Sequence, residues 1–154
     1  MSTAPTPSFR AAVEADVPFL AGLRQATMTP HLERQGLGIT DAEHRERAAL
    51  RLDAAAIIEI GGQAVGVIKV LQDGTTWTIE QFQITPAHQG RGLGTTVLRA
   101  VIGDARRSGA LLRLSVLKRN PAARLYARMG FRTLSESASS YKMTFIETEA
   151  PSAG

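Results

Sequence analysis

A glycine-rich segment, Gln89-Gly90-Arg91-Gly92-Leu93-Gly94, has the residue types and the spacing to bind a phosphate group. It separates a strand-like run, 77–84, from a helix-like run, 93–107. Glycine adopts positive φ and lets the backbone come close to a ligand. The first N–H groups of a helix have no intrahelical partner, and the helix dipole favours an anion beside them. The segment therefore predicts a site for a pyrophosphate.

Three known phosphate-binding patterns compete for this segment. A Walker loop ends in Gly-Lys-Ser/Thr, and the segment contains no lysine. A dinucleotide fingerprint reads Gly-x-Gly-x-x-Gly, whereas here Gly94 follows Gly92 after a single residue. The pattern that fits is Gln-x-x-Gly-x-Gly, which resembles the acetyl-CoA loop of the GNAT N-acetyltransferases. The alternative is a tight strand–helix turn that binds no ligand.

A second motif, Asn120-Pro121-Ala122-Ala123-Arg124-Leu125-Tyr126-Ala127-Arg128-Met129-Gly130-Phe131, resembles the later GNAT motif, in which Asn is followed by Ala, Leu-Tyr and Gly-Phe. Its first residue suits a helix N-cap, and its glycine suits a C-cap. A buried strand, 111–117, is predicted before it. Because both motifs occur in the family's order, the chain is similar to GNAT proteins over 9–147.

The resemblance implies an α/β (α+β) protein with the GNAT acyl-CoA N-acyltransferase fold. Its mixed central sheet is flanked by helices, and strands four and five splay apart. Acetyl-CoA is expected in the gap between them, and a bulge near Gln83 and Ile84 is expected to free backbone groups for the pantetheine arm. By the same resemblance the residues that bind acetyl-CoA are Ile84, Gln89, Gly90, Arg91, Gly92, Leu93, Gly94, Thr95, Asn120, Ala123 and Tyr126.

Two residues are candidates for proton transfer during acetyl transfer to an amine. Tyr126 is expected to be the general acid, because the family places a tyrosine hydroxyl near the CoA sulfur and a phenol donates a hydrogen bond without ionising. Its alternative role is that of a core aromatic residue. Glu80 on strand four is expected to be the base, since a buried carboxylate has a raised pKa. Its alternative is an ion pair with an arginine such as Arg24.

The acceptor site is predicted from fewer signals. His31 lies in the segment that family members use to build this site, and it is either an alternative base or a surface residue. Gln81 and Gln83 are candidates for orienting a polar substrate, or they hydrogen-bond across the sheet. Arg24, Arg34 or Arg45 near the cleft would favour a carboxylate-bearing amine such as an amino acid, and the sequence does not place them. Acidic residues there would favour polyamines or aminoglycosides.

The predicted function is acetyl-CoA-dependent N-acetylation of a primary amine on a small molecule or a peptide, by direct attack in a ternary complex. With no cysteine in the chain, a Cys nucleophile is excluded. The alternative is a catalytically weak GNAT-fold sensor that binds acyl-CoA, or an acyltransferase that uses another acyl-CoA. The resemblance is compatible with a homodimer, and no metal is expected because the three histidines lack ligand spacing.

The length indicates one domain, which the resemblance implies is a GNAT domain over 8–148, between flexible tails at 1–7 and 149–154. The net charge of +4 raises nucleic acid as a partner, but the basic residues are scattered and form no run, so none is expected. No apolar run reaches the length of a membrane span, and the first residues lack a signal-peptide pattern, which favours a cytoplasmic protein without a membrane partner.

Periodicity and turn residues predict the remaining elements. Thr40 and Glu43 have the spacing of a capping box. Strands are expected at 9–14, 54–60, 64–71, 76–84, 131–136 and 141–146, with helices from 16 to about 26, from 40 to about 52 and at 93–107, and a connector at 27–38.

Overall fold

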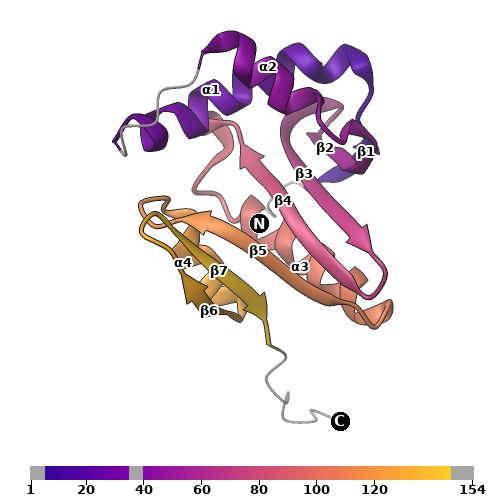
Figure 1. Ribbon diagram of the computed structural model, residues 1–154. Coiled ribbons are helices and arrows are strands. Elements are labelled where there is room, and N and C mark those ends of the chain that lie inside the picture. The colour runs from indigo at the N-terminus through magenta and orange to yellow at the C-terminus, as the bar shows by residue number, and fades with distance from the viewer. Residues whose placement is uncertain (1–5, 35–39, 147–154) are drawn as a thin grey trace.

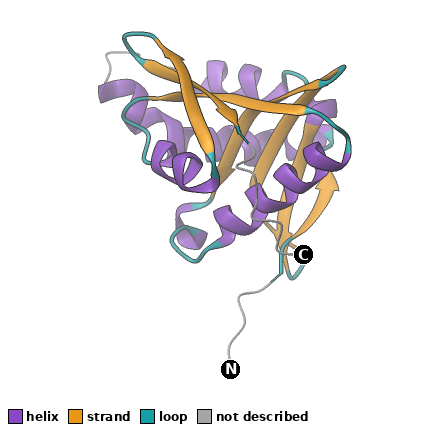
Figure 2. Ribbon diagram, turned by 90° about the horizontal axis from the view of Figure 1, so that it is seen from below, coloured by secondary structure: helices purple, strands orange, loops and turns teal. Residues whose placement is uncertain are grey.

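The computed structural model describes residues 6–34 and 40–146, without the side chains of 27–34 and of Asp41. Seven strands form one sheet in the order β1-β2-β3-β4-β5-β7-β6, with helices on both faces (Figures 1 and 2). In chain order the elements are β1 Ser8–Ala11, η1 Glu14–Asp16, α1 Val17–Arg34, α2 Asp41–Ala49, η2 Leu52–Ala54, β2 Ala55–Ile60, β3 Gln63–Asp73, β4 Thr76–Ile84, η3 Pro86–His88, α3 Leu93–Arg107, β5 Leu111–Leu117, α4 Ala122–Met129, β6 Phe131–Glu136 and β7 Ser140–Phe145.

The parallel pair β4–β5 divides the sheet, and it is only partly hydrogen-bonded. Residues 76–79 of β4 pair with residues 111–114 of β5, and the register ends there. Beyond that point the two strands diverge, and Figure 1 shows their arrowheads pointing apart. The predicted mixed sheet with splayed fourth and fifth strands is therefore confirmed. The divergence leaves the carboxyl-terminal half of β4 without a neighbour on the β5 side.

Each face of the sheet has its own apolar core. Residues of α3 and α4 pack with β5 on one face, around Val97, Leu98 and Phe131. Residues of α1 and α2 pack on β2 and β3 on the other face, around Leu20, Ile57 and Val67. The polar side chains discussed below lie where the second core meets β4. None of the helices in the described ranges is both long enough and apolar enough to span a membrane.

On the first face, α3 begins at a glycine and α4 ends at one. Gly92 is the N-cap of α3 with φ 78°, and Gly130 is the C-cap of α4 with φ 111°. L-residues with a side chain rarely adopt these conformations, so glycine is required at both ends. The two helices also pack closely, because a Cβ on Gly94 would lie 3.1 Å from Leu125 Cδ2. The glycine loop is thereby held against the second motif.

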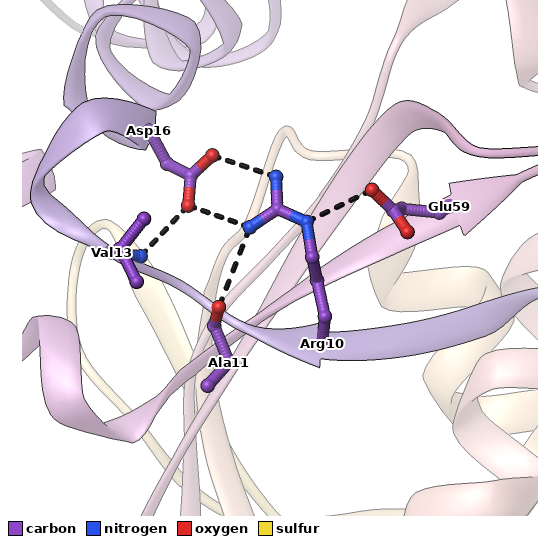
Figure 3. Close-up of polar contacts among 5 residues, drawn as sticks. All are labelled: Arg10, Ala11, Val13, Asp16 and Glu59. Carbon is purple, nitrogen blue, oxygen red and sulfur yellow. Dashed lines mark hydrogen bonds and ion pairs between the residues drawn. The ribbon is translucent and has the colours of Figure 1, made fainter.

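Arg10 joins the first strand to the start of α1 and to β2 (Figure 3). Its guanidinium donates to the two carboxylate oxygens of Asp16 at 2.8 and 2.9 Å and to Glu59 at 2.9 Å. Asp16 also accepts from the Val13 N–H at 2.8 Å. The Arg10 guanidinium holds the pKa of the Asp16 carboxyl below its usual range. This network fixes the chain at the entry to α1.

The first helix is longer than its local sequence predicts. The expected connector 27–38 is wrong for residues 27–34, which continue α1 as far as Arg34. Threonine and Pro30 are poor helix formers, so propensity alone predicts an end near Ala26. The physical reason for the difference is tertiary: α1 packs along α2 in an antiparallel pair, and such packing overrides propensity.

Candidate active site

The backbone of the glycine loop turns sharply at two glycines before α3 begins. Gly90 and Gly92 have φ of 77° and 78°, in the left-handed region. As the N-cap of α3, Gly92 has no side chain to bond to the first turn, and the first intrahelical bond runs from Thr96 N to Gly92 O at 3.1 Å. The early N–H groups of the 15-residue helix α3 therefore face outward at its positive end.

Gln89 ties this loop to the end of β4. Its amide Nε2 donates to the Ile84 carbonyl oxygen at 2.8 Å. The short turn between them is also held by the Thr85 hydroxyl, which lies 2.9 Å from His88 Nδ1. Gln89 was predicted among the residues that bind the cosubstrate. In the structure its side chain bonds the loop to the strand, so it maintains the backbone geometry of the loop.

The backbone of Ile84 faces the gap between β4 and β5. The Thr85 N–H donates to the Val65 carbonyl of β3 at 2.8 Å. Successive residues of a strand direct their N–H and C=O groups to opposite sides, so those of Ile84 point away from β3. The Ile84 carbonyl accepts from Gln89, and its N–H is directed into the region where the two strands diverge. An N–H in this position is suited to bind a carbonyl oxygen.

Tyr126 lies on the buried face of α4. It is 5% exposed, and its ring meets Phe131 edge to face with centroids 5.7 Å apart. Burial raises the pKa of Tyr126 to about 12, because the phenolate loses its hydration. The hydroxyl is thus protonated at neutral pH and keeps a proton that it can donate. The ring belongs to the apolar cluster of that face, as the core-aromatic alternative predicts.

Asn120 caps α4. Its side-chain Oδ1 accepts from the Ala122 N–H at 2.9 Å, and its backbone carbonyl accepts from the Ala123 N–H at 3.1 Å. A pocket of about 720 Å³ opens beside this cap, between α4 and the β6–β7 hairpin, and it does not include the glycine loop. The pocket is lined by Lys118, Arg119, Asn120, Pro121, Ala123, Arg124, Ala127, Thr133, Tyr141 and Met143.

Glu80 is not the buried carboxylate that simple strand alternation predicts. The β3–β4 register passes from Lys69↔Gln81 to Val70↔Ile79, so Glu80 has no partner and forms a bulge. The side chain of Glu80 is exposed. The bulge therefore lies at Glu80 and not near Gln83 and Ile84, and the prediction of a bulge at the end of β4 is wrong in position. The extra residue interrupts the alternation of faces along β4.

One consequence of the bulge is that Gln81 and Gln83 face α1. Ile79 and Ile84 belong to the core under α3, with Phe82 packed against it. Gln81 and Gln83 are buried, and the Nε2 of Gln81 donates to the Oε1 of Gln83 at 2.7 Å. Simple alternation along the strand predicts Ile79 on the same face as Gln81 and Gln83. In the structure Ile79 lies on the α3 face and the two glutamines lie on the opposite face. Both candidates for orienting the acceptor are thus on one face.

Arg24 and Lys69 are buried on that same face of the sheet. Arg24 lies one turn after Leu20 on α1, and its Nε has no hydrogen-bond partner within the described part of the chain. Lys69 Nζ donates to the Leu50 carbonyl at 2.5 Å. Burial lowers the pKa of both groups, and the positive charge of Arg24 lowers that of Lys69 further. Sequence reasoning missed Lys69, although a lysine within the apolar run 64–71 is a signal.

The predicted site residues therefore separate into groups. Ile84, the glycine loop and Gln89 lie at the diverging ends of β4 and the start of α3. Asn120 and Ala123 lie at the start of α4, and Tyr126 lies in its interior. The acceptor candidates Arg24, Gln81 and Gln83 lie on the α1 face. The His31 side chain, an alternative base, lies outside the described residues.

Comparisons with known proteins agree with this geometry. A family model described as the acetyltransferase (GNAT) family matches residues 21–131. Streptothricin acetyltransferase from Streptomyces lavendulae is 38% identical over 74 residues, which are 47% of this chain and 39% of that protein. The chain thus matches about two fifths of the length of that relative.

Two solved structures share the fold. PaiA N-acetyltransferase from Thermoplasma acidophilum, in complex with coenzyme A, superposes with a TM-score of 0.74 at 15% identity and covers 90% of this chain and 97% of that chain. N-acetylglutamate synthase from Neisseria gonorrhoeae, complexed with coenzyme A and N-acetyl-glutamate, gives a TM-score of 0.65 at 20% identity, over 95% of this chain and 37% of that chain.

Proposed function

Because the chain belongs to the acetyltransferase (GNAT) family, we propose that it transfers an acetyl group from acetyl-CoA to a primary amine of a small molecule or a peptide. The amine attacks the thioester directly while both substrates are bound. The observation that carries this proposal is the divergence of β4 from β5 beside the uncapped start of α3. This arrangement supports the proposal because the first N–H groups of α3 and the Ile84 N–H lie at the same divergence, where they would bind a phosphate and a carbonyl oxygen.

The residues at this gap fit acetyl-CoA, which when bound supplies the acetyl group as a thioester. The N–H groups that follow Gly92 would hold the pyrophosphate, because they lack intrahelical partners and face outward at the positive end of α3. Gly90 and Gly92 leave no side chain in front of these groups. The Ile84 N–H would bind the thioester carbonyl oxygen, where negative charge develops as the amine attacks.

Tyr126 is the proposed general acid. A departing thiolate must be neutralised, and the buried hydroxyl of Tyr126 holds a proton at neutral pH because burial raises its pKa to about 12. Its ring is fixed by the edge-to-face contact with Phe131. The hydroxyl would transfer its proton to the sulfur as the carbon–sulfur bond breaks.

Glu80 is the proposed base. Its carboxylate is exposed at the β4 bulge, four residues before Ile84 along the strand. From this position it would accept the proton of the amine through solvent rather than by direct contact. Bulges often occur next to active sites, where they change the direction in which a side chain points. The bulge at Glu80 therefore supports a functional role for its carboxylate.

A pair of measurements tests the proposal. CoA added to the purified chain should raise the melting temperature, because a ligand that binds only the folded state stabilises it. Release of the CoA thiol from acetyl-CoA in the presence of an amine panel should then detect turnover. A melting shift without thiol release from any amine would favour the acyl-CoA sensor over the enzyme. Absence of both would refute the proposal.

A further inference from the structure

The α1 face of β4 carries a buried polar cluster within an otherwise apolar layer. Its members are Arg24 on α1, Lys69 on β3, and Gln81 and Gln83 on β4, which are 8%, 3%, 8% and 6% exposed. Lys69 is the cross-strand partner of Gln81, and Gln81 donates to Gln83. The helix α1 contacts β4 and lies over its carboxyl end in Figure 1. The cluster therefore joins three elements beside the proposed reaction site.

The charge of this cluster is unbalanced among the described side chains. Arg24 and Lys69 are both cations, and each is removed from water. Lys69 donates to a neutral backbone carbonyl, and the Arg24 Nε has no partner within the described residues. The carboxylates that act on Lys69 are those of Glu80 and Asp53, and both are exposed. Buried cations of this kind favour a bound anion, which gains charge-assisted hydrogen bonds.

The position of the cluster relates it to the acceptor rather than to CoA. The side chains of Phe82 and Ile84 point toward the α3 core, whereas those of Gln81 and Gln83 point to the opposite face. The pyrophosphate site at α3 is thus separated from Arg24 and Lys69 by the sheet. Along β4, Gln81 and Ile84 are three residues apart, which is about 10 Å of extended strand. A small molecule with an anionic end and an amine spans such a distance.

We propose that the acceptor is an amino acid or another small amine that carries a carboxylate, and that Arg24 and Lys69 bind this carboxylate. Gln81 and Gln83 border the bound molecule, and the amine extends along β4 toward Ile84. This inference rests on the proposed acetyl transfer. Two buried cations also disfavour polyamines and other polycationic acceptors, because a like charge beside them has no compensating partner.

Matched acceptors test the preference. Thiol release from acetyl-CoA is measured with L-lysine against L-lysinamide, with 4-aminobutyrate against 4-aminobutanamide, and with spermidine. We expect kcat/KM to be about tenfold to hundredfold higher for each carboxylate than for its amide, which is the effect of a charge-assisted hydrogen bond. Equal rates within each pair, or a preference for the amides or for spermidine, would overturn the inference and leave the acetyl transfer intact. If CoA gives no melting shift and no acceptor gives thiol release, both proposals fail.

Variants test the residues. Arg24→Gln should raise KM for the carboxylate acceptors about tenfold or more and leave both kcat and the kinetics of the amides nearly unchanged. Arg132→Gln, which removes an exposed cation of β6 on the other side of the β4–β5 divergence, is the matched control and should change neither. Lys69→Met repeats the test with a side chain of similar length. An equal loss on carboxylates and amides would assign Arg24 a structural role and refute its part in binding. If a variant does not fold, the acceptor pairs measured with the unaltered chain still decide the inference.

Discussion

The buried hydroxyl of Tyr126 makes a prediction that is independent of the identity of the acceptor. Replacing Tyr126 by Phe removes one oxygen and keeps the ring against Phe131. Because burial raises the pKa of Tyr126 to about 12, against about 10 in an unfolded chain, the protonated phenol stabilises the fold relative to the phenolate. This stabilisation is fully present below pH 10 and is lost as the pH rises through 12.

The magnitude follows from the two pKa values. A difference of two pKa units corresponds to about 2.7 kcal/mol when the group is fully ionised in both states. At pH 11.5 the folded phenol is only partly ionised, and the linkage relation gives about 2 kcal/mol. The free energy of unfolding of the native chain should therefore fall by this amount more than that of the Tyr126→Phe variant between pH 9 and pH 11.5.

Urea unfolding of both proteins across this pH range measures the difference. All other ionisable groups are the same in both chains, so their contributions cancel when the two free energies are subtracted. A difference that stays constant from pH 9 to pH 11.5 would show that the hydroxyl is in contact with water, and the assignment as a buried general acid would lose its basis. In the same variant we expect kcat to fall about 100-fold, the contribution of a positioned acid, with CoA binding nearly unchanged. Tyr141→Phe is the control for both measurements.

The remaining predictions concern the loop, the base and the entry to α1. Gly92→Ala should cost about 1 to 2 kcal/mol, because φ is 78°, and should reduce the CoA-induced melting shift. Gly61→Ala is the control, because Gly61 also has a positive φ but lies in a hairpin turn away from the loop. This variant should lose similar stability and keep the CoA-induced melting shift. If both variants lose the melting shift equally, the phosphate site is refuted. Glu80→Gln should abolish the acidic limb of the pH profile of kcat/KM, and an unaltered profile would reject Glu80 as the base. Arg10 lowers the pKa of Asp16, so the native chain should lose stability as the pH falls below about 3.8, and the Asp16→Asn variant should lose less. Thermal unfolding of both proteins from pH 2 to pH 6 measures this difference. Parallel curves of melting temperature against pH would contradict it.

Local signals predicted several elements well. The bounds of β4, α3 and β5 agree with the strand 76–84, the helix 93–107 and the strand 111–117 expected from the sequence. The capping box also forms, with Glu43 N donating to the Thr40 hydroxyl at 3.2 Å and Thr40 N donating to Glu43 Oε1 at 3.3 Å. These features depend on residues within a few positions of one another, so their physical cause is contained in the local sequence.

The errors arise where the cause is distant in the sequence. The length of α1 depends on its packing against α2, and a propensity count does not include that contact. The face of Glu80 depends on the bulge opposite Lys69 and Val70, which belong to the neighbouring strand. The extra residue at the bulge reverses which side chains of β4 face each side of the sheet. As a result Gln81 and Gln83 are buried, and Glu80 is exposed.

The sequence by itself determined the family and predicted the donor site, because the glycine loop and the Asn120-to-Phe131 motif are contiguous and each requires particular residue types at particular spacings. Only the tertiary structure decided which polar groups are buried together under α1. Arg24, Lys69 and Gln81 lie on three separate elements, and their meeting results from the register of β3 on β4 and from the packing of α1 over the sheet. Burial then gives this cluster its chemistry, because the same cations in water would have no preference strong enough to select a substrate.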